Sequence, residues 1–175
     1  MEKVKKARED AIRIKKIQVE MKNRRFLYIL LPIIFLSCGK GILYEEFRTI
    51  PGAKWDKGEE KLFEAHVEDT SGIYNIYVSV RNSGEYRYRN LFLFVNTASP
   101  AGQVVRDTVE ILLANEKGKW MGKGFGGIWE TEKIYKRQVQ FPVKGVYVFS
   151  VQHGMRTDTL HHILDAGIRI VKVKI

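Results

Sequence analysis

Hydrophobic and polar residues alternate with a period of two in two segments, 63–68 and 74–81. The apolar positions of these segments are Phe63, Ala65, Val67, Tyr74, Ile76, Val78 and Val80. An extended chain points successive side chains to opposite faces, so this pattern predicts half-buried β-strands.

Six further segments have the apolar composition of strands and are bounded by Gly, Asn, Pro or charged turns. Residues 90–97 (NLFLFVNT) are apolar at both sets of alternate positions, which predicts a central strand buried on both faces. The others are residues 42–50, 104–113, 134–141, 146–153 and 167–175. About eight short strands predict an all-β fold, an antiparallel two-sheet sandwich of which the jelly roll is one form. The one helix expected among them is residues 159–164.

The chain ahead of these strands has the three-part layout of an export signal. In residues 21–37 the basic Lys22, Arg24 and Arg25 precede an apolar run, 26–36, and the small Ser37. Eleven residues make a helix of about 16 Å, too short to cross a hydrocarbon core of about 30 Å. We therefore expect a helical signal peptide at 21–37 rather than a membrane span.

The one cysteine of the chain, Cys38, directly follows this signal. The sequence Phe35-Leu36-Ser37-Cys38 resembles a bacterial lipoprotein signal, although Phe35 stands where Leu is usual. The resemblance implies that Cys38 is lipidated and becomes the first residue of the mature protein. Gly39 and Lys40 follow, and the lack of Asp at this point favours the outer membrane over the inner.

Residues 1–20 lengthen the charged region beyond what an export signal needs. Apolar residues recur there at helical spacing, which fits an amphipathic helix on a membrane or in the cytosol. We favour the simpler interpretation, an upstream start codon with Met21 as the true start, because residues from Met21 on already make a complete signal. No repeat or linker divides the rest, so we expect a single domain at 38–175.

The distribution of charge limits the kinds of partner. The 175 residues carry a net charge of +10, which by itself is typical of proteins that bind nucleic acid or a membrane surface. Residues 1–37 hold ten Lys and Arg against four Asp and Glu, whereas residues 38–175 hold twenty against sixteen. Most of the excess therefore belongs to the export region, and we expect no nucleic-acid binding.

A glycine-rich segment has the spacing of a dinucleotide-binding turn, GxGxxG, at Gly122, Gly124 and Gly127. Such a turn must follow a strand and open a helix whose N-terminus faces the pyrophosphate. The residues after Gly127 favour a strand instead, so we expect a loop in which glycine permits positive φ angles, and no cofactor.

Candidate chemistry is sparse elsewhere. His161, His162 and Asp165, with His153 upstream, could supply zinc ligands, but adjacent histidines on one element point in different directions. No serine lies in a GxSxG context. We expect neither a metal site nor catalysis.

Aromatic side chains offer a binding function of another class. Tryptophan and tyrosine on a sandwich can stack on sugar rings, although aromatic residues also favour strands for packing reasons alone. The residues concerned are Trp55, Trp120, Trp129, Tyr86, Tyr88 and Tyr135. A coplanar, exposed tryptophan pair would favour a sugar-binding protein, and complete burial would exclude one.

Several stretches resemble the GldH family of gliding motility-associated lipoproteins of the Bacteroidetes. They are LSCGK at 36–40, YNIYVSVRNSGEYRYRNLFLFVNT at 74–97, LANEKGKWMGKGFGG at 113–127, FPVKGVYVFSVQHGMRTDTL at 141–160 and ILDAGIRIVKV at 163–173. The family tends to have glycine before the isoleucine that matches Ile163, where this chain has His162.

The resemblance implies a lipid-anchored protein on the periplasmic side of the envelope, in the context of gliding and type IX secretion. It makes the segment His153-Gly154-Met155-Arg156 a candidate partner-facing or structural motif, together with Trp120, Gly122 and Gly124. The simpler interpretation of the first segment is a strand-ending turn in which Arg156 caps carbonyls or pairs with Asp158.

We therefore expect a non-enzymatic lipoprotein that binds other envelope proteins. The alternative is a carbohydrate- or peptidoglycan-binding lipoprotein with an aromatic platform.

Overall fold

The computed structural model describes residues 41–173. The expected signal peptide, Cys38 and residues 1–20 lie outside the described residues. The described part contains one short 3-10 turn, η2 (Pro51–Ala53), and no helix within it is long and apolar enough to cross a membrane. Its strands are β1 (Ile42–Thr49), β2 (Lys54–Asp56), β3 (Lys61–Val67), β4 (Tyr74–Ser83), β5 (Asn90–Ala98), β6 (Val104–Leu112), β7 (Lys123–Phe125), β8 (Ile128–Val139), β9 (Gly145–His153), β10 (Thr159–His161) and β11 (Ile163–Lys172).

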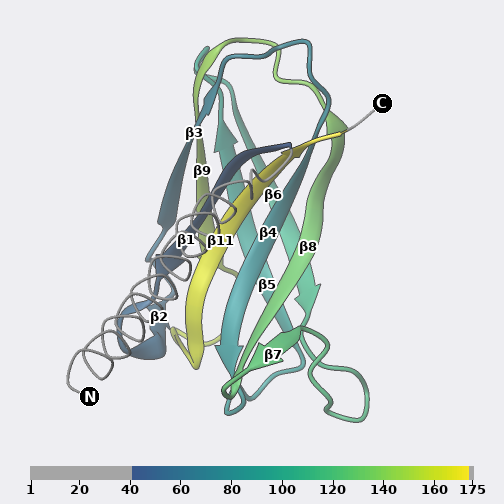
Figure 1. Ribbon diagram of the computed structural model, residues 1–175. Coiled ribbons are helices and arrows are strands. Elements are labelled where there is room, and N and C mark those ends of the chain that lie inside the picture. The colour runs from purple at the N-terminus through teal and green to yellow at the C-terminus, as the bar shows by residue number, and fades with distance from the viewer. Residues whose placement is uncertain (1–40, 174–175) are drawn as a thin grey trace, which may run out of the picture. The chain divides into compact units, whose positions relative to one another are not determined.

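The strands form two main antiparallel sheets and one small one. The first sheet has the order β1-β11-β4-β8-β7, the second β3-β9-β5-β6, and β10 pairs with β2 in the third. In Figure 1 the sheet of β11, β4 and β8 lies in front of β9, β5 and β6. The long strands alternate between the two sheets in chain order, except for the β5–β6 hairpin, which is the order of a jelly roll. The prediction of an all-β fold with antiparallel sheets is confirmed.

The predicted alternation places one apolar face of each sheet in a shared core. In β3 every second side chain, from residue 61 to residue 67, is buried and the others are exposed. Burying a large apolar side chain contributes about 1.5–3 kcal/mol, so the core stabilises the face-to-face packing of the sheets. Its members from β3, β4, β5, β9 and β11 include Phe63, Ala65, Val67, Ile76, Val78, Val80, Leu91, Leu93, Val95, Phe149, Val151, Ile168 and Ile170.

The prediction of a helix at residues 159–164 is wrong. Thr159–His161 is strand β10, His162 has a φ of +69°, and β11 begins at Ile163 rather than at Gly167. The segment is extended because it pairs with β2, about a hundred residues earlier in the chain, and no local pattern shows that partner. Likewise β8 begins at Ile128, six residues before the strand expected at 134–141.

The expectation that residues 90–97 are buried on both faces is also wrong. In β5 the side chains of Leu91, Leu93 and Val95 are buried, but Phe92 is 37% exposed and Phe94 is half-buried. Strand β5 does lie inside its sheet, between β9 and β6. Its second apolar face therefore lies on the outside of the sandwich.

The strand register defines two ends of the domain. At one end the amide of Lys172 donates to the carbonyl of Gly41 at 2.7 Å, and Lys172 lies opposite Tyr74. At the other end Ser83 lies opposite Ile128. Strand β4 joins the two ends with ten residues, or about 30 Å. We call the second end the distal end; it carries loops 84–89, 113–122, 126–127 and 154–158 and the β2–β10 sheet.

Candidate functional site

The seven residues singled out as an interaction or structural motif all lie at the distal end. They are His153, Gly154, Met155, Arg156, Trp120, Gly122 and Gly124. The first four end β9 and open the loop that leads to β10, and the last three belong to the segment around β7. Their role in binding stays a prediction, but their surroundings distinguish packing residues from accessible ones.

His153 is a core residue. Its side chain is fully buried, and its ring meets the Trp55 ring edge-on at 5.6 Å. Neither ring nitrogen has a hydrogen-bond partner among the described residues. Burial lowers the pKa of His153 below its usual 6.5, and the nearby main chain of Trp55 and Asp158 offsets only part of this effect. His153 therefore supports the loop from inside and does not face a partner.

Gly154 and Met155 pack against the outer face of β5. The amide of Gly154 donates to the carbonyl of Phe92 at 2.6 Å, and the amide of Phe92 donates to the sulfur of Met155 at 3.4 Å. A Cβ on Gly154 would lie 3.2 Å from the ring of Phe94, so a larger residue would push the loop away from β5. The loop thus covers part of the apolar face that β5 leaves outside.

Arg156 is more accessible than Gly154 and Met155. It is exposed, and no ion pair or hydrogen bond of its side chain, with Asp158 or any other group, is found within residues 41–173. A guanidinium without a carboxylate partner keeps its five N–H donors for a group outside the chain.

Two adjoining pockets surround this loop. The first, of about 300 Å³, is lined by Arg87, Tyr88, Thr157, Thr159, Leu160, His161 and His162. The second, of about 350 Å³, is lined by Tyr88, Phe92, Gly154, Met155, Arg156 and Thr157. They share Tyr88 and Thr157 and so adjoin, and we call the pair the distal groove. Three of the four residues in the predicted segment line it.

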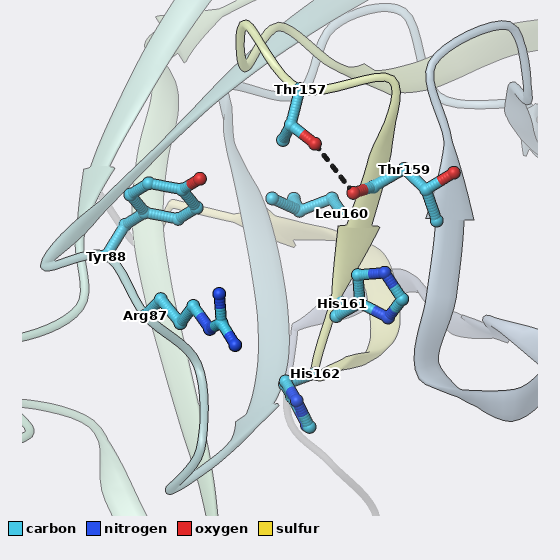
Figure 2. Close-up of a pocket in the computed structure, with 7 residues that line it drawn as sticks. All are labelled: Arg87, Tyr88, Thr157, Thr159, Leu160, His161 and His162. Carbon is cyan, nitrogen blue, oxygen red and sulfur yellow. Dashed lines mark hydrogen bonds between the residues drawn. The ribbon is translucent and has the colours of Figure 1, made fainter.

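Figure 2 shows how the first pocket is built. Arg87 and Tyr88, from the loop after β4, lie on one side, and Thr159 and His161, from β10, lie on the other. The hydroxyl of Tyr86 donates to the carbonyl of Asn90 at 3.0 Å, and burial raises the pKa of Tyr86 above its usual range. The Tyr86 ring packs edge-on against Tyr88 and so holds it at the groove.

The groove has one arginine in each pocket and large apolar side chains in the second. Its lining includes two arginines and two histidines but no aspartate or glutamate. Carboxylates lie beside the groove: Glu85 is 3.3 Å from Nδ1 of His162, and Asp56 accepts a hydrogen bond from the hydroxyl of Thr159 at 2.7 Å. Phe92 and Met155 are among the apolar side chains of the second pocket. This arrangement can bind an anionic group next to an apolar one.

Sequence reasoning missed Arg87. It belongs to the segment 85–90 (EYRYRN), where tyrosine and arginine alternate beyond the end of the predicted strand. Only Tyr86 is buried, while Arg87, Tyr88 and Arg89 are exposed. The alternation could have indicated Arg87, because a period of two places the tyrosines on one side of an extended segment and the arginines on the other.

The glycine-rich segment forms a hairpin, as expected of a loop in which glycine permits positive φ. Gly126 and Gly127 have φ values of +59° and +82° and make the two-residue turn between β7 and β8. Gly122 and Gly124 serve close packing instead. A Cβ on Gly122 would overlap the carbonyl oxygen of Glu130, and one on Gly124 would lie 2.6 Å from Nε1 of Trp129.

The two tryptophans near this hairpin contact each other. The rings of Trp120 and Trp129 are 5.7 Å apart, tilted by 34° and half-buried, whereas Trp55 is fully buried. The pair is therefore not the coplanar, exposed platform that would favour sugar binding. It is also not fully buried, the arrangement that would exclude sugar binding. Phe125, at the hairpin tip, is 93% exposed and was not expected to matter.

The structure separates the histidines considered as metal ligands. His153 is in the core, and the rings of His161 and His162 are 6.2 Å apart. Asp165 accepts a hydrogen bond from the hydroxyl of Thr49 at 2.8 Å. Among residues 41–173 no group of three or more His, Cys, Asp or Glu could hold a metal ion.

Comparison with known proteins gives a consistent family match. The family model described as GldH lipoprotein matches residues 42–170. The Gliding motility lipoprotein GldH homolog of Christiangramia forsetii is 36% identical over 154 residues, which cover 84% of this chain and 94% of that protein. The Gliding motility lipoprotein GldH of Flavobacterium johnsoniae is 33% identical over 159 residues, covering 87% and 98%.

Similarity to solved structures is weak. TmCBM61 in complex with beta-1,4-galactotriose is 11% identical, with a TM-score of 0.34, and the match covers 78% of this chain and 93% of that one. A structure of the infectious bursal disease virus Gx strain is 10% identical with the same TM-score, covering 72% and 32%. Scores this low support no argument about fold or ligand.

Proposed function

Because this chain belongs to the GldH lipoprotein family, we propose that it acts by binding other envelope proteins of a gliding motility or type IX secretion assembly. In this proposal it is an accessory or structural component and catalyses no reaction. It is attached to a membrane through lipid on Cys38, on the periplasmic side, and in the outer membrane rather than the inner.

The attachment follows from the family's description as a lipoprotein and from the sequence ahead of the domain. A single acyl chain binds a bilayer only marginally, so stable anchoring needs more than one. Bacterial lipoproteins with a signal of this kind carry three acyl chains. The mature protein in our proposal is residues 38–175, one domain that begins three residues before Gly41.

The observation that carries the proposal is the position of the distal groove. Gly41 pairs with Lys172 at one end of the sandwich, whereas the groove lies at the other, about 30 Å along β4. In the sequence, Cys38 precedes Gly41 by three residues, so the attachment point joins the chain at the end opposite the groove. The groove can therefore be presented away from the membrane, toward proteins of the periplasm.

The chemistry of the groove supports binding rather than catalysis. Its lining offers two guanidinium groups, two imidazoles, two hydroxyls and a phenol, but no carboxylate. An activated nucleophile is bonded to a base such as histidine, and among the described residues the hydroxyls of Thr157 and Thr159 donate to the Thr159 carbonyl and to Asp56 instead.

Sugar binding through the tryptophans is the weaker alternative. Trp129 contacts Trp120, and its ring atoms lie 3.0 Å and 2.6 Å from the positions that a Cβ on Gly84 and on Gly124 would take. These neighbours give Trp129 a packing role in the hairpin. The rings of the pair are also tilted by 34°, so they do not form one flat platform.

Capture from the native envelope tests the proposal. Full-length protein with an affinity tag would be cross-linked in cells, purified from the membrane fraction and compared with an unrelated tagged lipoprotein. We expect specific recovery of envelope proteins and a marked loss with Arg156→Ala. The matched control is Arg137→Ala, which removes an exposed arginine from β8 near the other end.

Two results would contradict the proposal. Recovery of no protein beyond those found with the unrelated lipoprotein would contradict the proposed binding function. Unchanged membrane attachment in Cys38→Ala would contradict anchoring through lipid on Cys38.

A further inference from the structure

Strand β10 has a free edge. It pairs with β2 on one side only, in a two-stranded sheet that no other described strand joins. Unpaired strand edges present N–H and C=O groups that another extended chain can bind. In most folds such edges are covered, so an open one beside a pocket is a candidate docking site.

The register identifies the groups at this edge. The amide of Lys57 donates to the carbonyl of Asp158 at 2.8 Å, and the amide of His162 donates to the carbonyl of Ala53 at 2.8 Å. In an antiparallel pair hydrogen-bonded positions alternate, so Leu160 is the next residue that bonds to β2. The main-chain groups of Thr159 and His161 therefore face away from β2.

The distal groove lies along this edge. Its first pocket has Thr159 and His161 on one side and Arg87 on the other, as Figure 2 shows. The hydroxyl of Thr157 donates to the carbonyl of Thr159 at 2.8 Å, which leaves one lone pair of that carbonyl and both N–H groups for a ligand. The pocket thus has the free edge of β10 on one side and the guanidinium group of Arg87 on the other.

The groove continues past this edge into an apolar pocket. Met155 and Phe92 line that pocket, and Arg156 lies at its side. Together the two pockets have about 300 and 350 Å³, room for several residues of an extended peptide but not for a folded element. The two arginines have no carboxylate partner in the described part of the chain.

We propose that the distal groove binds an extended acidic segment of a partner protein, which adds a third strand beside β10 and places its carboxylates on Arg87 and Arg156. Main-chain bonds to Thr159 and His161 supply affinity for any extended chain. The arginines select acidic side chains, and the Met155 pocket takes an apolar one. This inference rests on the proposed function, because it names the chemistry of the partner that the protein binds.

Defined peptides test the inference with full-length protein in detergent. The probe is a fluorescein-labelled heptapeptide in which Glu alternates with Val, and its binding is followed by fluorescence anisotropy. One comparison peptide has Gln in place of Glu, and another carries N-methyl groups on alternate amides. We expect the acidic peptide to bind, the Gln peptide to bind at least about tenfold more weakly, and the N-methylated peptide to lose binding.

Variants of the protein locate the site. Arg87→Ala and Arg156→Ala should each weaken the acidic peptide about tenfold, whereas the matched Arg137→Ala should leave it unchanged. All three arginines are exposed, so the variants should keep the melting temperature of the parent. Equal binding of the acidic and Gln peptides, no loss in Arg87→Ala, or tighter binding of oligo-dT would each overturn the inference.

The two proposals fail in different ways. If envelope partners are captured equally by the parent and by Arg87→Ala, and the acidic peptide does not bind, the proposed function stands and the strand-addition site falls. If no partner is captured, the proposed function itself falls, whatever the peptides do.

Discussion

The ring of His153 meets the ring of Trp55 edge-on, with centroids 5.6 Å apart and planes at 70°. Both side chains are fully buried. Burial disfavours the charged imidazolium, so the pKa of His153 in the folded protein lies below the value of 6.5 that the unfolded chain has. Protonating His153 therefore costs more free energy in the folded protein than in the unfolded chain. The stability of the fold is full above pH 6.5 and decreases as the pH falls below it.

The first prediction is therefore an acid-sensitive step in stability. Between pH 7 and about pH 5 the free energy of unfolding of the parent should fall, because unfolding lets His153 take up a proton. His153→Leu should flatten this part of the curve, since it removes the buried titrating group. Urea unfolding at a series of pH values measures the effect.

His66→Gln is the matched control, because His66 is exposed and lies 3.1 Å from Glu68. The variant should keep the fall in stability that His153→Leu removes. Parallel curves for the parent and His153→Leu over this pH interval would show that burial of His153 does not control the transition.

Gly122→Ala should destabilise the β7–β8 hairpin. An added Cβ would overlap the carbonyl oxygen of Glu130, a backbone atom that cannot move without opening the hairpin. We expect a loss of about 1–3 kcal/mol in the free energy of unfolding. Chemical denaturation followed by tryptophan fluorescence would also report the disturbed Trp129. Gly58→Ala is the control, because nothing lies within 4 Å of its added Cβ, and an equal loss there would contradict the argument.

His162→Gly should stabilise the protein. His162 has a φ of +69°, a left-handed conformation that costs a residue with a Cβ about 1–2 kcal/mol and glycine very little. The substitution gives up the contact of Nδ1 with Glu85, an exposed pair of low value. Glycine also costs conformational entropy on folding, which offsets part of this gain. We expect the free energy of unfolding, measured by thermal unfolding, to rise by about 0.5–1 kcal/mol.

The neighbouring His161 provides a control of opposite sign. It lies in β10, where glycine weakens a strand, so His161→Gly should lose about 0.5–1 kcal/mol. Destabilisation of similar size by both substitutions would mean that the φ of His162 carries no strain.

Period-two patterns predicted the sheets well because burial on one face enforces them. The alternation of Phe63, Ala65 and Val67 agrees with their burial in β3. The turn at Gly126 and Gly127 was also predictable, since a two-residue hairpin turn of type I′ requires positive φ at both positions. In both cases the controlling interaction is local in the sequence or repeats along it.

The rest depended on contacts between distant parts of the chain. Strand β10 exists because it pairs with β2, and residues 159–164 contain no sign of that partner. The outer position of Phe92 follows from the fold, in which the loop at Met155 covers part of β5. Arg87 becomes a site residue only because the loop after β4 lies across from β10.

A final prediction concerns the turn between β3 and β4, near Gly41. Oδ1 of Asp69 accepts hydrogen bonds from the amide and hydroxyl of Ser71 and from the amide of Gly72, and Oδ2 accepts one from Lys172 at 2.6 Å. Lys172 has the largest effect, followed by Ser71, and together they hold the pKa of Asp69 well below its usual 3.8. This stabilisation is present above pH 3.8 and is lost as the pH falls below it.

Lys172→Met should therefore raise the pKa of Asp69 without restoring its usual value, because the bonds from Ser71 and Gly72 remain. Ser71→Ala should raise it less, since it removes the hydroxyl and keeps the amide bond. Carboxyl-carbon NMR titration measures all three proteins, with Lys144→Met as the control for loss of an exposed lysine. A larger rise in Ser71→Ala than in Lys172→Met would show that the turn, and not the bond to β11, controls this carboxylate.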